Sequence, residues 1–171
     1  MRLGVDETGV TELMAVTEHT NGQSVVAAGL LLESLASDGA LVEPVEATAL
    51  TGPARQLVDE IRAVVSAAMG TDRIPAIWLA LARNPPYLES TWRKERVVMR
   101  DAALTARDKR RVALAVSMNA RSRYMIEYNT AILRHAGDGD EDLLEVLGVV
   151  DHYTCLNTLS DGMQIESDIR P

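Results

Sequence analysis

The spacing of apolar residues along the chain is helical almost throughout. Apolar residues recur at intervals of three and four over 11–18 and again over 24–34, which predicts a pair of helices near the start of the sequence. No stretch alternates between polar and apolar residues for long enough to require a strand. The pattern therefore predicts an all-α protein.

A loop rich in glycine, proline and acidic residues is expected over 37–51, and a series of helices follows it. The first of these helices should span 52–69 and end at Gly70, because glycine commonly closes a helix. Its buried stripe is expected to contain Leu57, Ile61, Val64 and Val65. Further helices are expected from Ile74 to the stop at Asn84-Pro85-Pro86, over 87–100, from an N-cap at Thr105 to a buried end at 112–118, over 123–135, over 140–151 and over 156–167.

The two ends of the chain repeat each other at a constant offset of 133 residues. Six identities share this offset without a gap: Gly4 and Gly137, Glu12 and Glu145, His19 and His152, Gly29 and Gly162, Glu33 and Glu166, Ser34 and Ser167. Two amphipathic helix pairs could match by chance, but six identities favour a true repeat. We therefore expect the two helix pairs to occupy equivalent places. The chain then divides into a partial repeat at 1–36, a loop at 37–51 and a helical domain at 52–171.

Composition and charge narrow the class of protein. The net charge of −8 argues against a nucleic-acid-binding protein, which needs a basic face. One basic run, 107–111, is expected to be a solvated helix face. The longest apolar stretch, 25–32, is too short to span a membrane, and no secretory leader is visible, so a cytoplasmic protein is expected.

Cys155 is the only cysteine in the sequence. An intramolecular disulfide is therefore impossible, and so is a dithiol redox cycle within one chain. We expect this cysteine to be buried and inert, and a redox sensor is the alternative.

Several runs between Ile74 and Ile165 together resemble one family of helical proteins. They are the run 77–85 (Ile-Trp-Leu-Ala-Leu-Ala-Arg-Asn-Pro), Leu104-Thr105 before the basic run, 112–119, and 124–137. The chain resembles the AhpD-like alkylhydroperoxidase and carboxymuconolactone decarboxylase family, and residues 1–34 resemble the closing helices of the same unit. The resemblance implies an all-helical bundle, with an internal helix-pair repeat here, assembled as a trimer or hexamer.

The family's signature is Cys-x-x-Cys-x-x-x-His on one helix, with a glutamate on the preceding helix. Two cysteines three residues apart share a helical face and can form a disulfide while they reduce a peroxide, and the histidine and glutamate can move protons. In this sequence the resemblance places Ser122 and Met125 at the cysteine positions, Asn129 at the histidine position and Arg110 at the glutamate position. None of these four side chains can perform the family's dithiol chemistry.

Other residues remain as candidates. Decarboxylase-like members carry a Tyr-Glu-Trp run, where this sequence has Tyr124-Met125-Ile126. A small-molecule pocket lined by Tyr124, Asn129 and Arg110 is possible, and Glu127 is expected to pair with Arg123 on the surface. The remaining assignments concern four residues: His19 and His152 are expected to satisfy carbonyls at helix ends, and Trp78 and Trp92 to anchor the core or an interface.

Three functions follow from these residues. The first is a non-catalytic homo-oligomer that acts in binding, scaffolding or regulation, with a possible small-molecule ligand and with no cofactor, metal, nucleic acid or membrane partner. The second is an enzyme with altered chemistry, of decarboxylase, lactone or hydrolase type, that uses Glu127, Tyr124 or a histidine. The third is a one-cysteine peroxidase that uses Cys155 and an external thiol.

Overall fold

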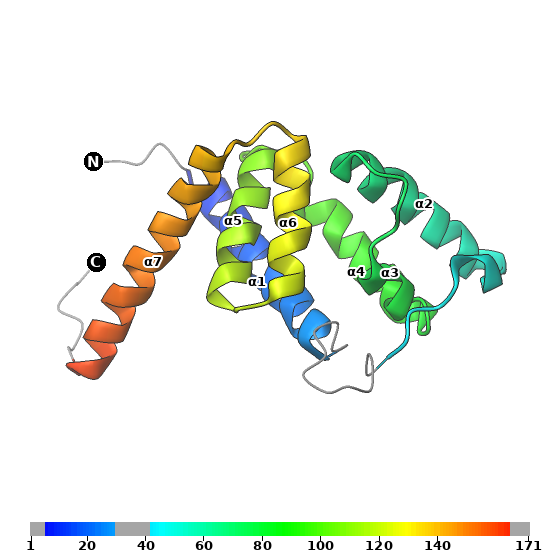
Figure 1. The fold of residues 1–171 in the computed structure, drawn as a ribbon, viewed down its shortest axis with the longest axis horizontal. Helices are drawn as coiled ribbons and strands as arrows, with labels where there is room; N and C mark the ends of the chain where they lie inside the picture. Colours follow the sequence, from blue (N-terminus) through cyan, green and yellow to red (C-terminus); the bar gives the residue numbers. More distant parts are fainter. Residues whose placement is uncertain (1–5, 30–41, 165–171) are drawn as a thin grey trace.

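The structure is a computed structural model that describes residues 6–29 and 42–164, and those residues form helices joined by short connections (Figure 1). The elements are α1 (Glu7–Gly29), the 3₁₀ turn η1 (Ala47–Ala49), α2 (Gly52–Met69), α3 (Ala76–Leu81), α4 (Pro85–Val98), α5 (Ala106–Asn119), α6 (Arg123–His135) and α7 (Asp140–Gly162). No strand occurs within the described ranges. The predicted all-α class is confirmed. None of the helices in these ranges is long and apolar enough to cross a membrane.

Local signals in the sequence set several helix ends. Helix α2 ends at Gly70, which adopts the left-handed backbone conformation with φ of +64°. At the start of α4, the side chain of Asn84 accepts a hydrogen bond from the Tyr87 N–H. At the start of α5, the Thr105 hydroxyl accepts one from the Asp108 N–H, as the sequence predicted.

The first and last predicted helix pairs are each a single helix within the described residues. Helix α1 continues from Glu7 to Gly29 and includes both predicted stretches up to that point, whereas 30–34 lies outside the described residues. Helix α7 likewise continues through the expected break near 152–155 to Gly162. The two helices have equal length and keep the offset of 133 residues.

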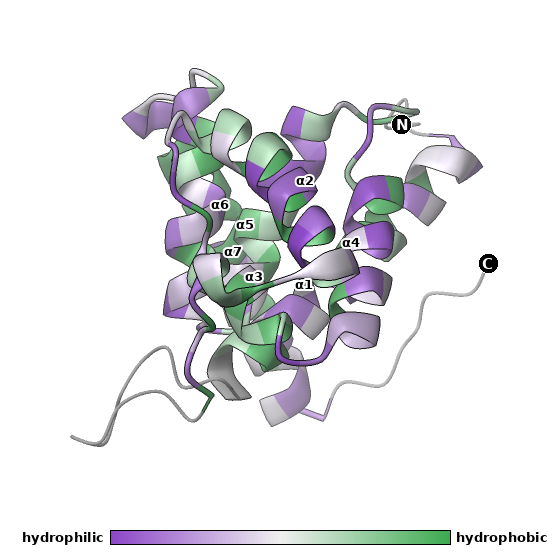
Figure 2. Cartoon of the chain, turned by 90° about the vertical axis from the view of Figure 1, so that its right-hand side faces the viewer, coloured by the Kyte–Doolittle hydropathy of each residue, from purple (hydrophilic) through white to green (hydrophobic). Residues whose placement is uncertain are grey.

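The helices are arranged around α5 and α6 (Figure 1). Helix α5 contacts α1, α6 and α7, and α2 contacts α3, α4 and α6. Helix α7 lies at one side of the molecule and projects away from the other helices, while α2, α3 and α4 lie at the opposite side. Seen from that opposite side, the ribbons of α2 and α4 carry many hydrophilic residues (purple in Figure 2). Helix α1 packs against α4, α5 and α6, whereas α7 packs mainly against α5. The repeat-related helices α1 and α7 therefore do not occupy the equivalent places that we expected.

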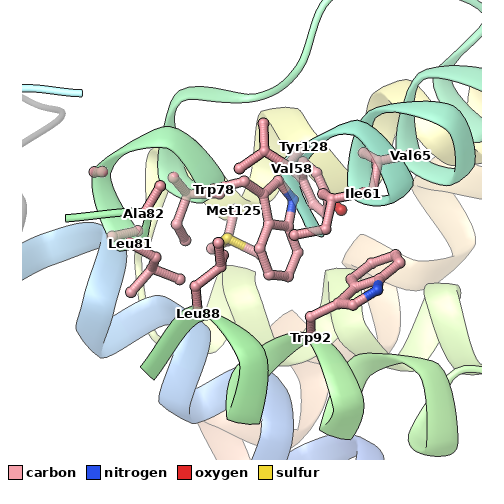
Figure 3. Packing of buried hydrophobic residues seen from close by; sticks show 13 residues of the cluster. Val58, Ile61, Val65, Trp78, Leu81, Ala82, Leu88, Trp92, Met125 and Tyr128 are labelled. Atoms are coloured by element: carbon pink, nitrogen blue, oxygen red, sulfur yellow. The ribbon is translucent and has the colours of Figure 1, made fainter. Parts of the chain in front are cut away.

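The apolar core joins α2, α3, α4 and α6 (Figure 3). Trp78 and Trp92 lie at its centre with ring centroids 5.5 Å apart and an interplanar angle of 84°, which is the edge-to-face arrangement that aromatic pairs favour. Ile61 and Val65 of α2 are buried there as predicted, and Val58 joins them. Val64 was expected in the same stripe but is 45% exposed, because the buried face of α2 is centred on Ile61.

Candidate functional site

A buried carboxylate on α4 joins three helices through hydrogen bonds. Glu95 is only 5% exposed. Its Oε2 lies 2.6 Å from His19 Nε2 of α1 and accepts a second hydrogen bond from Gln23 Nε2, also of α1, at 3.0 Å. Its Oε1 accepts a hydrogen bond from Arg110 Nη2 of α5 at 2.9 Å. Both carboxylate oxygens are thus occupied by donors.

The same network continues from α5 to α6. Arg110 Nη1 donates to Asn129 Oδ1 at 3.0 Å, and Asn129 Nδ2 donates to Ser117 Oγ at 3.0 Å. The Ser117 hydroxyl donates in turn to the Ala113 carbonyl oxygen at 2.7 Å. We call the six linked side chains the polar network: His19, Gln23, Glu95, Arg110, Ser117 and Asn129. All six are buried.

Charge pairing decides the protonation of this network. Burial alone would raise the pKa of the Glu95 carboxyl, but the positive charge of Arg110 and the hydrogen bond from His19 outweigh it and hold that pKa at about 2. Burial would lower the pKa of Arg110, but the Glu95 carboxylate raises it. Glu95 is therefore ionised at neutral pH, so the hydrogen atom between the two groups belongs to His19 Nε2.

A cavity of about 490 Å³ opens beside the network, between α2, α4, α5 and α6. Its wall is mainly apolar, and its principal apolar residues are Val64, Val65, Trp92, Met99, Tyr128 and Ile132. Glu95 and Arg110 also line it. The volume lies in the range of small-molecule sites, roughly 300–1,000 Å³. We call this space the α4 cavity.

Basic side chains surround the α4 cavity. Arg96 and Arg107 line it but are paired with Glu60 and Asp138 respectively. Arg100 also lines it, and its guanidinium forms no ion pair or hydrogen bond with any of the described residues. An apolar cavity beside an unpaired guanidinium is suited to a ligand with an apolar body and an anionic group.

The structure brings together two of the four residues at the family's motif positions. Arg110 and Asn129 are hydrogen-bonded within the polar network. Ser122 precedes the first turn of α6 and Met125 is fully buried in the apolar core (Figure 3). A disulfide between positions 122 and 125 is excluded, because neither Ser122 nor Met125 carries a thiol.

The expected pocket of Tyr124, Asn129 and Arg110 does not form. Tyr124 and Glu127 line a different cavity, of about 500 Å³, and Asn129 is among the lining residues of neither cavity. The Tyr124 hydroxyl accepts a hydrogen bond from the Ile77 N–H at 3.2 Å, and burial raises the pKa of that hydroxyl. The expected surface pair of Arg123 with Glu127 is present at 3.0 Å.

The two repeat-related histidines have opposite environments. His19 is buried against Glu95, whereas His152 is exposed beside Tyr153. Both lie inside long helices, so the expected role of capping helix ends is wrong for each. Cys155 is also exposed, in the middle of α7, and the expectation that it is buried is wrong because that helix has no buried residue.

The basic run 107–111 was expected to be a solvated face, and this is wrong for two of its residues. Lys109 and Arg110 are buried. Lys109 Nζ donates to the Arg100 carbonyl oxygen at 2.8 Å and lies 3.1 Å from Glu12 Oε2 of α1. These two side chains face inward because carboxylates meet them there, Glu12 of α1 for Lys109 and Glu95 of α4 for Arg110.

Sequence reasoning missed Glu95, Gln23 and Ser117 entirely. Glu95 lies in a strongly polar stretch of α4, next to Lys94 and Arg96, and nothing in its spacing distinguishes it from a surface residue. One signal was available: the position that resemblance assigns to a glutamate carries Arg110, and a buried arginine requires a carboxylate partner elsewhere in the chain.

Comparisons with known proteins agree with this architecture. The model of the carboxymuconolactone decarboxylase family matches residues 85–165. The crystal structure of the alkylhydroperoxidase AhpD core from Rhodospirillum rubrum is similar with a TM-score of 0.59 and 30% sequence identity, over 66% of this chain and 84% of that one. Comparison with curated proteins found no match. The matched residues include α4, α5 and α6, which carry four of the six side chains of the polar network. This chain belongs to the AhpD-like and carboxymuconolactone decarboxylase family.

Proposed function

We propose that this protein binds a small molecule with an apolar body and an anionic group in the α4 cavity, and that it does not reduce peroxides through a dithiol. The observation that carries the proposal is the cavity itself. Its wall is mostly apolar, Arg100 is one of its lining residues, and the Arg100 guanidinium has no partner among the described residues. A carboxylate would give Arg100 the bidentate partner that its planar group favours.

The position of the sulfur atoms supports the second half of the proposal. The only thiol, Cys155, is on α7, which does not contribute to the α4 cavity. The motif-equivalent Met125 is a thioether, which cannot form a disulfide. A peroxide bound near Arg110 would therefore meet no thiolate of the same chain.

The polar network supports binding over acid–base catalysis in this cavity. A general base needs a pKa near the working pH, but Glu95 has a pKa of about 2 and both its oxygens already accept hydrogen bonds. Arg110 stays charged at any physiological pH because Glu95 raises its pKa. The network thus contributes an ion pair, Glu95 with Arg110, to the wall of the α4 cavity, and both oxygens of its carboxylate are already hydrogen-bonded.

An enzyme with altered chemistry is the alternative, and it would use Tyr124 and Glu127 in the second cavity. The two side chains line that cavity together with Arg73. Loss of a measured activity in Glu127→Ala but not in a variant of the α4 cavity would favour this alternative.

Binding of 1-naphthoate, measured by calorimetry against its neutral analogue 1-naphthalenemethanol, tests the proposal. The naphthoate should bind at least about tenfold more tightly, because only the acid can pair with Arg100. Arg100→Ala should remove that difference and leave weak binding of both compounds. Ala68→Trp should block both, since Ala68 is exposed and lines the cavity.

Ala67→Trp is the matched control, because Ala67 is the exposed neighbour on α2 and is not among the cavity's lining residues. It should bind naphthoate like the parent protein. Equal affinity for the acid and the alcohol, or naphthoate binding that survives Ala68→Trp, would contradict the assignment of the site. Dithiothreitol-dependent consumption of cumene hydroperoxide above the buffer rate that is lost in Cys155→Ser would favour the one-cysteine peroxidase instead.

A further inference from the structure

Helix α7 and the residue that follows it expose an apolar stripe from Val149 to Met163. Four residues form most of it, and all are well exposed: Val149 (58%), Leu156 (45%), Leu159 (57%) and Met163 (69%). His152 completes the stripe and is also exposed. No residue of α7 is buried. A helix that carries apolar residues on several sides normally lies inside a structure. Helix α7 packs on α5, but its stripe is not buried by any of the residues that the structure describes.

The spacing of the stripe is that of a helix-pairing seam. Its five positions follow one another at intervals of three, four, three and four residues, which is the a and d pattern of a heptad repeat. A single polar residue in such a seam, here His152, is a device that fixes register.

The positions that flank the seam are suited to a second copy of the same helix. They are Gly148, Tyr153, Cys155, Ser160 and Gly162, and none is charged. The acidic residues Asp151 and Asp161 lie at positions away from the seam. Two α7 helices can therefore approach along the stripe without bringing acidic residues together, although α7 contains acidic residues and no lysine or arginine.

The internal repeat relates this face to one that α1 uses for packing. Val149, His152 and Leu156 correspond at the offset of 133 residues to Val16, His19 and Gln23 of α1. Those three residues of α1 are buried against other helices of the chain. The same face is thus buried within the chain on α1. On α7 it is exposed, and Val149 lies at its edge beside a groove that α7 forms with α1 and α5.

We propose that the stripe of α7, formed by Val149, His152, Leu156, Leu159 and Met163, docks on the same stripe of a second copy of this chain. The contact is isologous, since each copy contributes the same helix. It gives the expected homo-oligomer a defined surface, and it does not depend on any ligand of the α4 cavity.

Sedimentation velocity between about 1 and 200 µM tests this contact. The parent protein should associate, and Leu156→Glu combined with Leu159→Glu should weaken association roughly 100-fold or more, because each contact would bury two charges per copy. Thr158→Glu is the matched control: it adds the same charge to the same helix at an exposed position on the opposite side, and it should associate like the parent.

Far-ultraviolet circular dichroism and naphthoate binding of the double variant should equal those of the parent protein, which separates this proposal from the one for the cavity. A parent protein that sediments as a monomer over the whole range would overturn the proposal. So would a folded double variant that associates as strongly as Thr158→Glu.

Discussion

Helices α1 and α7 have the same length and repeat-related sequences, but they are stabilised in different ways. Helix α1 contacts α4, α5 and α6 and holds Glu95 through His19 and Gln23. Helix α7 contacts α5 near its start and then projects from the bundle with its apolar residues exposed (Figure 1). The comparison teaches that related sequences give two helices a similar face for packing. Whether that face is buried within the chain depends on the helices around it.

Removal of the carboxylate that anchors α1 should have the largest effect. Glu95→Ala leaves Arg110 buried without its counter-charge and removes the acceptor for His19 and Gln23. We expect a loss of about 3–5 kcal/mol in the free energy of unfolding, measured by urea denaturation. Glu89→Ala on the same helix breaks only the exposed pair with Arg93 and should cost less than about 1 kcal/mol. Equal losses in the two variants would show that the network does not anchor α1.

Acid should lower the free energy of unfolding by protonating the Glu95 carboxylate. The pKa of Glu95 falls from 4.5 to about 2 on folding, so its contribution is complete above pH 5 and is lost as the pH falls towards 2. The full contribution is roughly 3 kcal/mol at 1.36 kcal/mol per unit. Urea denaturation at pH 6 and pH 3 should therefore show a steeper decline for the parent than for Glu95→Gln, which has no carboxyl to protonate there. Parallel declines would contradict the assigned pKa.

The two repeat-related histidines should differ in their contributions to the free energy of unfolding, by less than the effect of Glu95. His19→Ala removes a hydrogen bond to a charged, buried partner and should cost roughly 2 kcal/mol. His152→Ala changes an exposed side chain and should stay within about 0.5 kcal/mol when unfolding is measured at low protein concentration, where α7 is unpaired. Similar costs would mean that α7 is buried by its own chain.

Helix periodicity and end signals made most of the fold predictable. The bounds of α2 follow from Gly52-Pro53 and Gly70, the end of α6 follows from Gly137, and these signals are local. The continuity of α1 across Asn21 and Gly22 was not predictable, because tertiary contacts of its buried face override two weak helix formers.

The candidate site was only half predictable. Resemblance directed attention to Arg110 and Asn129, which do lie together. It gave no indication of Glu95, because that carboxylate comes from another helix and its burial depends on how α1 packs over α4. The exposure of Cys155 was also beyond a pattern argument, since an apolar helix without a partner looks the same in sequence as a buried one.

Hydrogen–deuterium exchange measured at low and at high protein concentration tests the contrast between the two helices most directly. Peptides covering 12–27 of α1 should be protected equally at both concentrations, because their partners belong to the same chain. Peptides covering 149–163 of α7 should exchange quickly at low concentration and become protected at high concentration. Protection of 149–163 that is strong and independent of concentration would contradict the account.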